Sequence, residues 1–404
     1  MKSLRELYKI GYGPSSSHTM GPQKACELFL ERFPDAVRFR VILYGSLAMT
    51  GKGHLTDVVI KKTLKDVDII FDDTYLSWHP NTFDIYGYSS NDETYVMRFY
   101  SVGGGSIQIE GEPALTLDEV YPHQSFDAIR DYCIQENIRL YEYVERFEGP
   151  DIWDYLNEIY KTMMEAIDRG LNRDGFLPGE LNIRRKARGI LSAISENEPP
   201  ELTTIRLVSA YAYAVSEENA SGNIVVTSPT CGASGVIPSV LRFSQDKYNH
   251  SKQSCLHALA TAGVIGNLIK HNASISGAIA GCQAEVGSAS AMAASMRAEL
   301  HNLSLSQIEY AAEVSLEHHL GLTCDPILGY VQIPCIERNA VAALRAIDAT
   351  GLAYFLSQTR KISLDMVIDT MYQTGKDIHT KYRETGVGGL ALLYGKIKGE
   401  KEPV

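Results

Sequence analysis

Cysteine is scarce in this sequence, and an excess of positive charge is absent. Seven cysteines among 404 residues are an odd number at low density, so a secreted scaffold built on disulfides is excluded and reduced thiols are expected. Lys and Arg number 38 against 49 Asp and Glu, which gives a formal net charge of −11. Proteins that bind nucleic acid by neutralising phosphates carry the opposite balance, so we expect no nucleic-acid partner.

Long apolar runs are missing as well. The N-terminal sequence MKSLRELYKIGYG has no apolar core of the kind that a signal peptide needs. No stretch approaches the roughly 18 consecutive apolar residues of a membrane-spanning helix. With 45% hydrophobic and 22% charged residues, the composition is that of a globular protein. We therefore expect a cytoplasmic protein with no membrane partner, long enough for two or three domains.

The first part of the chain alternates strand and helix patterns. Segments rich in β-branched and aromatic residues predict strands at 36–44, 67–73, 93–104 and 105–111, with the glycines at 103–105 as a turn. Helical patterns lie at about 20–33 and 54–65. These features predict a mixed α/β domain with a small sheet over residues 1–149, ending at Gly149-Pro150.

Strand patterns nearly vanish after residue 150. Apolar residues between 256 and 268 follow the i, i+3, i+4, i+7 spacing of a buried helix face, and small residues repeat that spacing between 284 and 295. Small side chains let another helix or a loop approach the backbone closely. The patterns predict a larger all-α domain over residues 150–404, so the expected fold class is α+β.

Two segments have the make-up of anion sites. GSLAMTGKG at 45–53 follows a predicted strand, but five residues rather than four separate Gly45 from Gly51-Lys52, and Gly53 stands where Ser or Thr would bind magnesium. A nucleotide-binding loop is therefore disfavoured. GPSSSHT at 13–19 offers several hydroxyls in a row, which fit a helix N-cap, a site for a carboxylate, or both in one loop.

Three of the thiols lie beside backbone breakers in the second half of the chain. Gly281 precedes Cys282, and prolines lie next to the segment from Cys324 to Cys335. The separations of 42 and 11 residues differ from the CxxC pairs of structural zinc sites. From spacing alone, these thiols are either buried small side chains or ligands that converge from loops on a metal group.

Five segments in order resemble the iron–sulfur-dependent L-serine dehydratases: GPSSSHTMGP, YGSLAMTGKGHLTD, TSPTCGASGVIPSVL, NASISGAIAGCQAEVGSASAMAA and HHLGLTCDPILGYVQIPCIERNA. The resemblance runs from about residue 8 to about residue 391, where KYRETGVGGLA also fits. It implies a β-type domain followed by an all-α catalytic domain in one chain. It also implies a 4Fe-4S cluster with one iron free of protein ligands, held by Cys282, Cys324 and Cys335. The other four cysteines are then buried packing residues: Cys26, Cys133, Cys231 and Cys255.

The reaction implied by the resemblance is the elimination of water from L-serine, which gives aminoacrylate and then pyruvate and ammonia. The open iron would stabilise the departing hydroxide as a Lewis acid, and no pyridoxal phosphate is required. The resemblance makes His54 the favoured base for the Cα proton and His18 a base or proton relay. Aligned donors would hold the substrate carboxylate, and our candidates for this are Ser15, Ser16, Ser17, Thr19, Asn272, Ser274 and Ser276.

Some residues differ from the commoner family pattern, so more than one amino acid is considered as the substrate. Leu55 follows His54 where the family usually continues with glycine, and Leu328-Gly329 replaces a small pair. Elimination from L-threonine, L-cysteine or another β-substituted amino acid therefore stays an alternative. Some single-chain members end in a cysteine that caps the open iron, whereas the printed chain ends in Glu402-Pro403-Val404. We therefore expect solvent or another small ligand at that iron.

Two other classes of protein were weighed. A three-cysteine zinc hydrolase would contain zinc without inorganic sulfide. A non-enzymatic amino-acid sensor would not need both histidines and all three cysteines, whose presence argues against it. The small-residue helix faces fit a homodimer as well as an interface within one chain.

Overall fold

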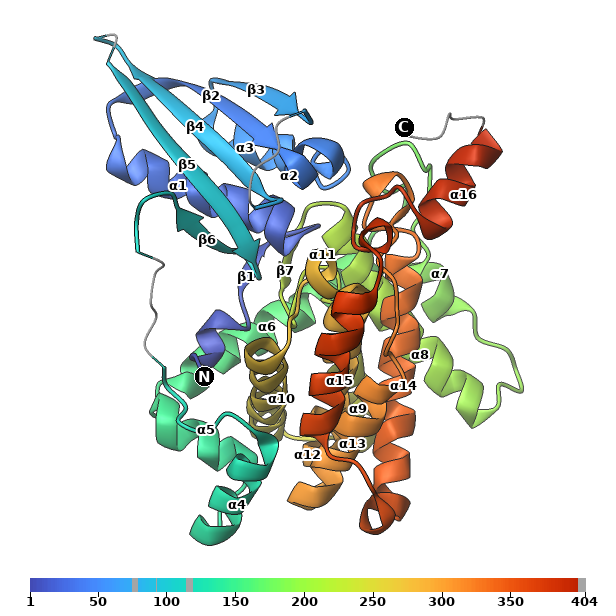
Figure 1. Ribbon diagram of the computed structural model, residues 1–404. Coiled ribbons are helices and arrows are strands. Elements are labelled where there is room, and N and C mark those ends of the chain that lie inside the picture. Colours follow the sequence, from blue (N-terminus) through green and yellow to red (C-terminus); the bar gives the residue numbers. More distant parts are fainter. Residues whose placement is uncertain (75–78, 92, 114–118, 399–404) are drawn as a thin grey trace.

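The computed structural model describes residues 1–74, 79–91, 93–113 and 119–398. A sheet with helices on one face lies beside a larger bundle of helices (Figure 1). The predicted α+β class is confirmed, with the mixed part first in the sequence and the helical part after it.

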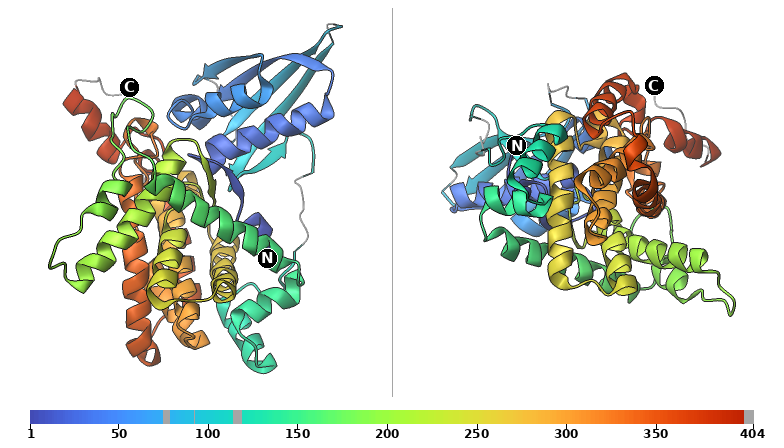
Figure 2. Two further views of the ribbon diagram at one scale, coloured as in Figure 1. Left: turned by 180° about the vertical axis from the view of Figure 1, so that it is seen from behind. Right: turned by 90° about the horizontal axis from the view of Figure 1, so that it is seen from below.

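The first part contains a five-stranded mixed sheet in the order β3-β2-β4-β5-β6. Only β2 and β3 pair in parallel. Two longer helices, α1 and α3, pack on each other and on one face of this sheet (Figure 2, left). The elements are α1 (Gly21–Arg32), β2 (Ala36–Tyr44), α2 (Gly45–Thr50), α3 (Thr56–Leu64), β3 (Val67–Asp72), β4 (Thr82–Ser89), β5 (Thr94–Gly103) and β6 (Ser106–Ile109).

Strand β4 was not predicted, although it lies in the middle of the sheet. Its alternation is disguised, because Asp84 is a buried acid that accepts hydrogen bonds from Arg98 and Tyr44. Gly87, on the same strand, leaves room for the ring of Phe29. The four predicted strands, both predicted helices and the glycine turn after β5 all match elements of the structure.

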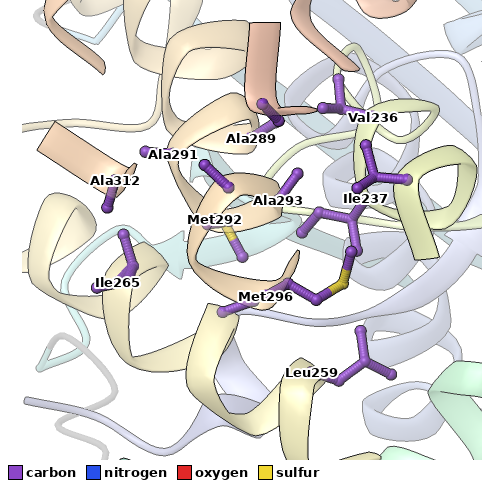
Figure 3. Close-up of a cluster of buried hydrophobic side chains, with 14 of the residues drawn as sticks. Val236, Ile237, Leu259, Ile265, Ala289, Ala291, Met292, Ala293, Met296 and Ala312 are labelled. Atoms are coloured by element: carbon purple, nitrogen blue, oxygen red, sulfur yellow. The ribbon is translucent and has the colours of Figure 1, made fainter. Parts of the chain in front are cut away.

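The helical part is built around α12 (Ser288–Leu300), every residue of which is buried. Its small side chains let α9, α10, α13 and α14 pack closely around it, as the small-residue pattern predicted. Figure 3 shows part of this core, with α12 side chains between those of α9 and α10. The helices are α4 (Phe126–Glu136), α5 (Leu140–Glu148), α6 (Ile152–Leu171), α7 (Ala187–Ser192), α8 (Pro200–Ala220), α9 (Val236–Tyr248), α10 (Lys252–Asn272), α11 (Gly277–Ala280), α12, α13 (Leu305–Glu317), α14 (Cys335–Leu356), α15 (Leu364–Asp377) and α16 (Gly389–Lys398).

Short elements complete the fold. They are the 3-10 turns η1 (Leu4–Glu6), η4 (Ile327–Gly329), η5 (Ser357–Thr359) and η6 (Thr380–Tyr382), the π-helical turns η2 (Ser16–Met20) and η3 (Gln283–Gly287), and the strands β1 (Ile10–Tyr12) and β7 (Ile224–Val226). Strand β1 pairs with β7 in an antiparallel two-stranded sheet. The segment before the sequence SSSHT is therefore fixed to the helical part.

The boundary between the two hydrophobic cores does not lie after residue 149, where the sequence predicted a domain boundary. One core draws on residues from Ala25 to Ile109, whereas Met1 and the residues from Tyr121 onward belong to the core of the helical part. Gly149-Pro150 separates α5 from α6, and both helices pack in that same core. The sheet part is thus inserted in the helical part after the first residues of the chain.

Helix α14 and the turn that follows it, Cys335–Thr359, are long and apolar enough to match a membrane span in length and composition. Of the most apolar window in this segment, 44% is buried inside the protein. Helix α14 packs against α8, α9, α12 and α13, which is the environment of a core helix. One such helix is therefore weak support for a membrane span.

Candidate active site

A small cavity lies where the sheet part and the helical part of the protein meet. Several of the functional residues predicted from the sequence line it. Its volume is about 20 Å³, the space of roughly one water molecule. Pro14, Ser15 and His54 line it from one side, and residues of the helical part line the rest: Gly232, Cys282, Glu285, Val286, Cys324, Pro326, Val331, Cys335 and Glu384.

The three thiols predicted to converge do line one cavity. Cys282 lies directly before η3, Cys324 lies in the loop after α13, and Cys335 is the first residue of α14. All three are buried. A helix N-terminus favours negative charge, so the position of Cys335 suits a thiolate ligand. This donor set fits a group that takes cysteine sulfur as its ligands.

Arg338 supplies positive charge beside these sulfurs. Its guanidinium forms a hydrogen bond with Cys282 and an ion pair with Asp325 at 3.1 Å, and it donates to the Thr323 carbonyl oxygen. A hydrogen bond from Cys324 lowers the pKa of Cys282, despite its burial. Cys282 is thus the first of the pair to become a thiolate, and a bound metal group would take the place of the bond between the two thiols.

Glu285 belongs to the same group of donors, although the sequence analysis did not single it out. One of its carboxylate oxygens and the sulfurs of Cys282 and Cys324 all lie within 4.8 Å of one another. A Cβ atom on Gly277 would come within 2.7 Å of the carboxylate and 3.2 Å of the Cys324 sulfur. Burial raises the pKa of Glu285 to about 7. Its position inside the motif GCQAEVG was the available signal.

A second carboxylate, Glu384, enters the cavity from the segment before α16. Its backbone N–H donates to the Cys324 carbonyl oxygen at 2.8 Å, and the Cys324 N–H donates to the Tyr382 carbonyl oxygen. Burial raises the pKa of Glu384 well above its ordinary value. The residue has a positive φ of 58°, a strained conformation that is found mostly where function or context imposes it. Glu384 lies in the segment KYRETGVGGLA, which also fits the family pattern, but no role was predicted for it.

His54 presents one free nitrogen to the cavity. Its Nδ1 lies 3.0 Å from the Thr50 carbonyl oxygen, which only accepts hydrogen bonds, so Nδ1 carries the proton of the neutral ring. Nε2 is buried without a hydrogen-bond partner among the described residues and lies 3.8 Å from a Glu384 oxygen. Burial lowers the pKa of His54 to about 4. The ring is therefore neutral near pH 7, with its lone pair on Nε2.

His18 lies beside His54, with 4.5 Å between the ring centroids. Both of its nitrogens have hydroxyl partners, Ser17 at 2.9 Å and Ser46 at 3.0 Å. Burial and the neighbouring His54 lower the pKa of His18 well below its ordinary value. His18 is thus held in place on both sides, whereas His54 is held on one.

The hydroxyls of the sequence SSSHT mostly hold this arrangement together. Ser15 accepts a hydrogen bond from the His18 N–H, as an N-cap does, and it also lines the cavity. Thr19 donates to the His54 carbonyl oxygen at 2.8 Å and accepts from the Ser15 N–H. Ser16 is buried within η2. Of the four hydroxyl residues predicted to bind a carboxylate, Ser15 is the one on the wall of the described cavity.

The second group of predicted binding residues lies at the end of α10 and the start of α11. The Asn272 side chain donates to the Gln124 and Leu268 carbonyl oxygens. Ser274 accepts from the backbone N–H of Ser276. In the described part of the chain, none of these three residues lines the cavity with the thiols.

The two parts approach each other most closely beside His54. A Cβ atom on Gly53 would come within 2.9 Å of the Gly329 carbonyl oxygen. Leu55 and Leu328, one on each side of this contact, both have the left-handed backbone conformation, with φ of 55° and 52°. This conformation is costly for a leucine. The two leucines that depart from the family pattern therefore shape the seam next to the histidine.

The four cysteines expected to be packing residues are buried at other places in the two cores: Cys26, Cys133, Cys231 and Cys255. Burial raises the pKa of the Cys255 thiol to about 11 and that of Cys133 to about 12. They are therefore protonated near neutral pH.

The chain has an α+β fold, and its candidate active site lies at the seam between a sheet domain and a helical domain. Residues 115–391 match the family described as serine dehydratase alpha chain, and residues 3–66 match the family described as serine dehydratase beta chain. The chain is 39% identical to L-serine dehydratase 1 of Escherichia coli K12, an alignment that covers 97% of this chain and 99% of that protein. It is 40% identical to an L-serine dehydratase of Helicobacter pylori (96% and 98% covered) and 38% identical to one of Streptomyces coelicolor (96% and 98% covered). The chain therefore belongs to the serine dehydratase family.

Proposed function

We propose that this enzyme is an L-serine ammonia-lyase that removes water from L-serine and yields pyruvate and ammonia. The observation that carries the proposal is that His54, whose Nε2 has no hydrogen-bond partner among the described residues, lines the same small cavity as the thiols of Cys282, Cys324 and Cys335. Removal of a proton and a hydroxide from adjacent carbons requires a base and a metal-ligating set in one cavity. The relatives named above support the choice of L-serine.

His54 is the proposed base. The Thr50 carbonyl oxygen fixes the Nδ1–H tautomer, so Nε2 has a lone pair available for the Cα proton. Because burial lowers the pKa of His54, the ring is unprotonated before the substrate arrives. The Glu384 carboxyl group lies 3.8 Å from Nε2; burial raises its pKa, so it would stabilise the resulting imidazolium only in its ionised form. His18, with both nitrogens engaged, positions His54 and is not the first acceptor of the proton.

Ser15 is the hydroxyl residue that we propose to contact the substrate carboxylate. It lies on the cavity wall beside His54, and its neighbours Ser17 and Thr19 are occupied in holding the two histidines. These two residues, with Ser16, therefore act by positioning. Direct contacts of Asn272, Ser274 and Ser276 with the substrate stay a prediction from the sequence.

A 4Fe-4S cluster on Cys282, Cys324 and Cys335 would supply a Lewis-acidic iron that stabilises the departing hydroxide. Arg338 would offset part of the negative charge of the thiolates, and the helix dipole of α14 would act in the same direction. Removal of the Cα proton by His54 and loss of hydroxide give aminoacrylate, which tautomerises and hydrolyses in water to pyruvate and ammonia. The proposal needs no pyridoxal phosphate. We also propose a cytoplasmic location and a homodimer, both carried over from the sequence.

The test is an assay of anaerobically purified protein, with iron and sulfide counted on the same sample. We expect pyruvate formation from L-serine, with L-threonine and L-cysteine assayed beside it for the corresponding keto acids. The His54→Ala variant should lose about 10²–10⁴-fold in kcat while its iron content persists. His257→Ala is the matched control, because His257 stacks on Tyr141 of α5 and does not line the described cavity. Near-normal turnover of His54→Ala would remove His54 as the base, and a fully active, colourless protein would remove the cluster.

A further inference from the structure

One carboxylate of the cavity lies on the side of the thiols and the other on the side of the histidine. Glu285 and the sulfurs of Cys282 and Cys324 lie mutually within 4.8 Å, and among the described residues this is the only such group of three ligating side chains. Glu384 instead approaches His54, at 3.8 Å from Nε2. Both acids are near Cys282, whose charge contributes to the raised pKa of Glu384, but Glu285 is the one that belongs to the group of three ligating side chains.

The surroundings hold the Glu285 carboxylate against the thiols. A Cβ atom on Gly277 would come within 2.7 Å of one carboxylate oxygen, and a Cβ atom on Gly232 within 3.3 Å of the other. A larger residue at Gly277 would displace the carboxylate, and one at Gly232 would press on it. The two glycines therefore form a slot for this side chain, and the same Gly277 Cβ would lie 3.2 Å from the Cys324 sulfur.

Glu285 is partly buried, and a hydrogen bond from Thr230 lowers the pKa of its carboxyl group, against the effect of desolvation. Buried charges in proteins are paired or coordinate a metal. The nearby cation, Arg338, is engaged with Asp325 at 3.1 Å, with the Thr323 carbonyl oxygen and with Cys282. Carboxylate oxygen is an established ligand of iron in non-haem sites. Coordination of iron by Glu285 would therefore compensate the carboxylate charge, which Arg338 compensates little because it is bound mainly to other groups.

We infer that Glu285 supplies the ligand of the iron that the three cysteines leave open in the substrate-free enzyme. The inference rests on the proposed function, since it presupposes a cluster on Cys282, Cys324 and Cys335. It replaces the solvent ligand expected from the sequence. L-Serine then displaces a carboxylate that stays in its slot beside the cysteines, and this carboxylate returns when the product leaves.

The experiment uses the anaerobic holoenzyme without substrate, reduced to its paramagnetic state, with iron and sulfide counted on every sample. Electron–nuclear double resonance is recorded in water enriched in ¹⁷O, and separately on protein carrying glutamate labelled with ¹³C in its side-chain carboxylate. We expect the wild-type cluster to show a ¹³C coupling and no strong ¹⁷O coupling from solvent. In Glu285→Gln the ¹³C coupling should disappear and a strong ¹⁷O coupling should appear.

Glu384→Gln is the matched control, because it removes the other carboxylate of the same cavity. It should keep the wild-type couplings. A wild-type cluster that binds ¹⁷O from solvent and lacks the ¹³C coupling would overturn the inference, as would a ¹³C coupling lost in Glu384→Gln. If Glu285→Gln fails to assemble a cluster, the wild type and Glu384→Gln still decide between these outcomes. Wild-type protein whose iron and sulfide counts exclude a 4Fe-4S cluster would refute the proposed function as well, so the two failures are distinguished.

Discussion

Replacing Gly53 by alanine tests whether the seam between the two domains sets the position of His54, the proposed base. Gly53 directly precedes His54, and its α-carbon faces the backbone of Leu328 and Gly329 across the seam. Its φ lies outside the left-handed region, so an alanine can adopt the same backbone conformation. The substitution therefore changes one thing, the space that a methyl group requires.

The methyl group added at Gly53 would lie too close to two backbone oxygens across the seam. The added Cβ would lie 2.9 Å from the Gly329 carbonyl oxygen and 3.1 Å from that of Leu328, whereas ordinary contacts begin at 3.4 Å. Both atoms are backbone, so neither can swing aside, and the seam must open by about 0.5 Å. Since a misplacement of about 1 Å can cost about 10²-fold in rate, we expect about a tenfold loss in kcat, equivalent to about 1.4 kcal/mol.

The assay is pyruvate formation by the Gly53→Ala holoenzyme, with the melting temperature and iron content measured in parallel. Gly351→Ala is the matched control, because no atom lies within 4 Å of the Cβ that it would add. It should leave kcat unchanged and raise stability slightly, as Gly→Ala changes in helices do. Full activity of Gly53→Ala would show that the seam does not position His54. A drop in its melting temperature as large as that of a core substitution would show that the contact supports the fold.

Three further predictions concern charged groups. Glu218→Gln should lower the free energy of unfolding by about 3 kcal/mol in urea titrations, because it removes the negative charge that pairs with the buried Arg185 at 2.9 Å; a loss below about 1 kcal/mol would contradict this. Burial and the neighbouring Glu317 raise the pKa of Glu313 from 4.5 to about 7, so the folded state holds a proton that the unfolded chain has released, and stability falls as the pH rises through this range. Glu313→Gln should therefore raise the melting temperature more at about pH 8 than at about pH 5, and an equal effect at both would refute the shift. Arg338→Met should release iron to a chelator about tenfold faster or more, as losses of groups behind metal ligands do, whereas release at the wild-type rate would show that Arg338 does not support Cys282.

The glycines and prolines beside the cysteines, together with the run of hydroxyl residues, indicated most of the residues of the candidate site. Glycine and proline beside Cys282, Cys324 and Cys335 indicated loops and helix ends, and the structure places all three on one cavity. Spacing alone could not decide whether they met, because contacts between residues 42 positions apart depend on how whole helices pack. The resemblance to a family, and not the spacing, separated these three cysteines from the other four.

The two carboxylates and the domain boundary were beyond the reach of local patterns. Glu285 and Glu384 are unremarkable in sequence, since acids are common on exposed surfaces and only the tertiary fold brings these two into the cavity with the thiols. Gly149-Pro150 is a strong local break, yet the helices on both sides of it share one core. Strand β4 escaped for a related reason, because its inward Asp84 is satisfied by a partner on the next strand, Arg98.

The insertion of the sheet domain has a consequence for how the active site assembles. Strand β1 anchors its incoming end to β7, and the chain re-enters the helical core by Tyr121. His54 thus lies on an insertion of roughly a hundred residues whose two ends are both attached to the helical part. These two attachments keep His54 near the cysteines. Because both parts belong to one chain, their contact is intramolecular and does not depend on protein concentration. The seam therefore needs little affinity of its own to keep His54 near the cysteines.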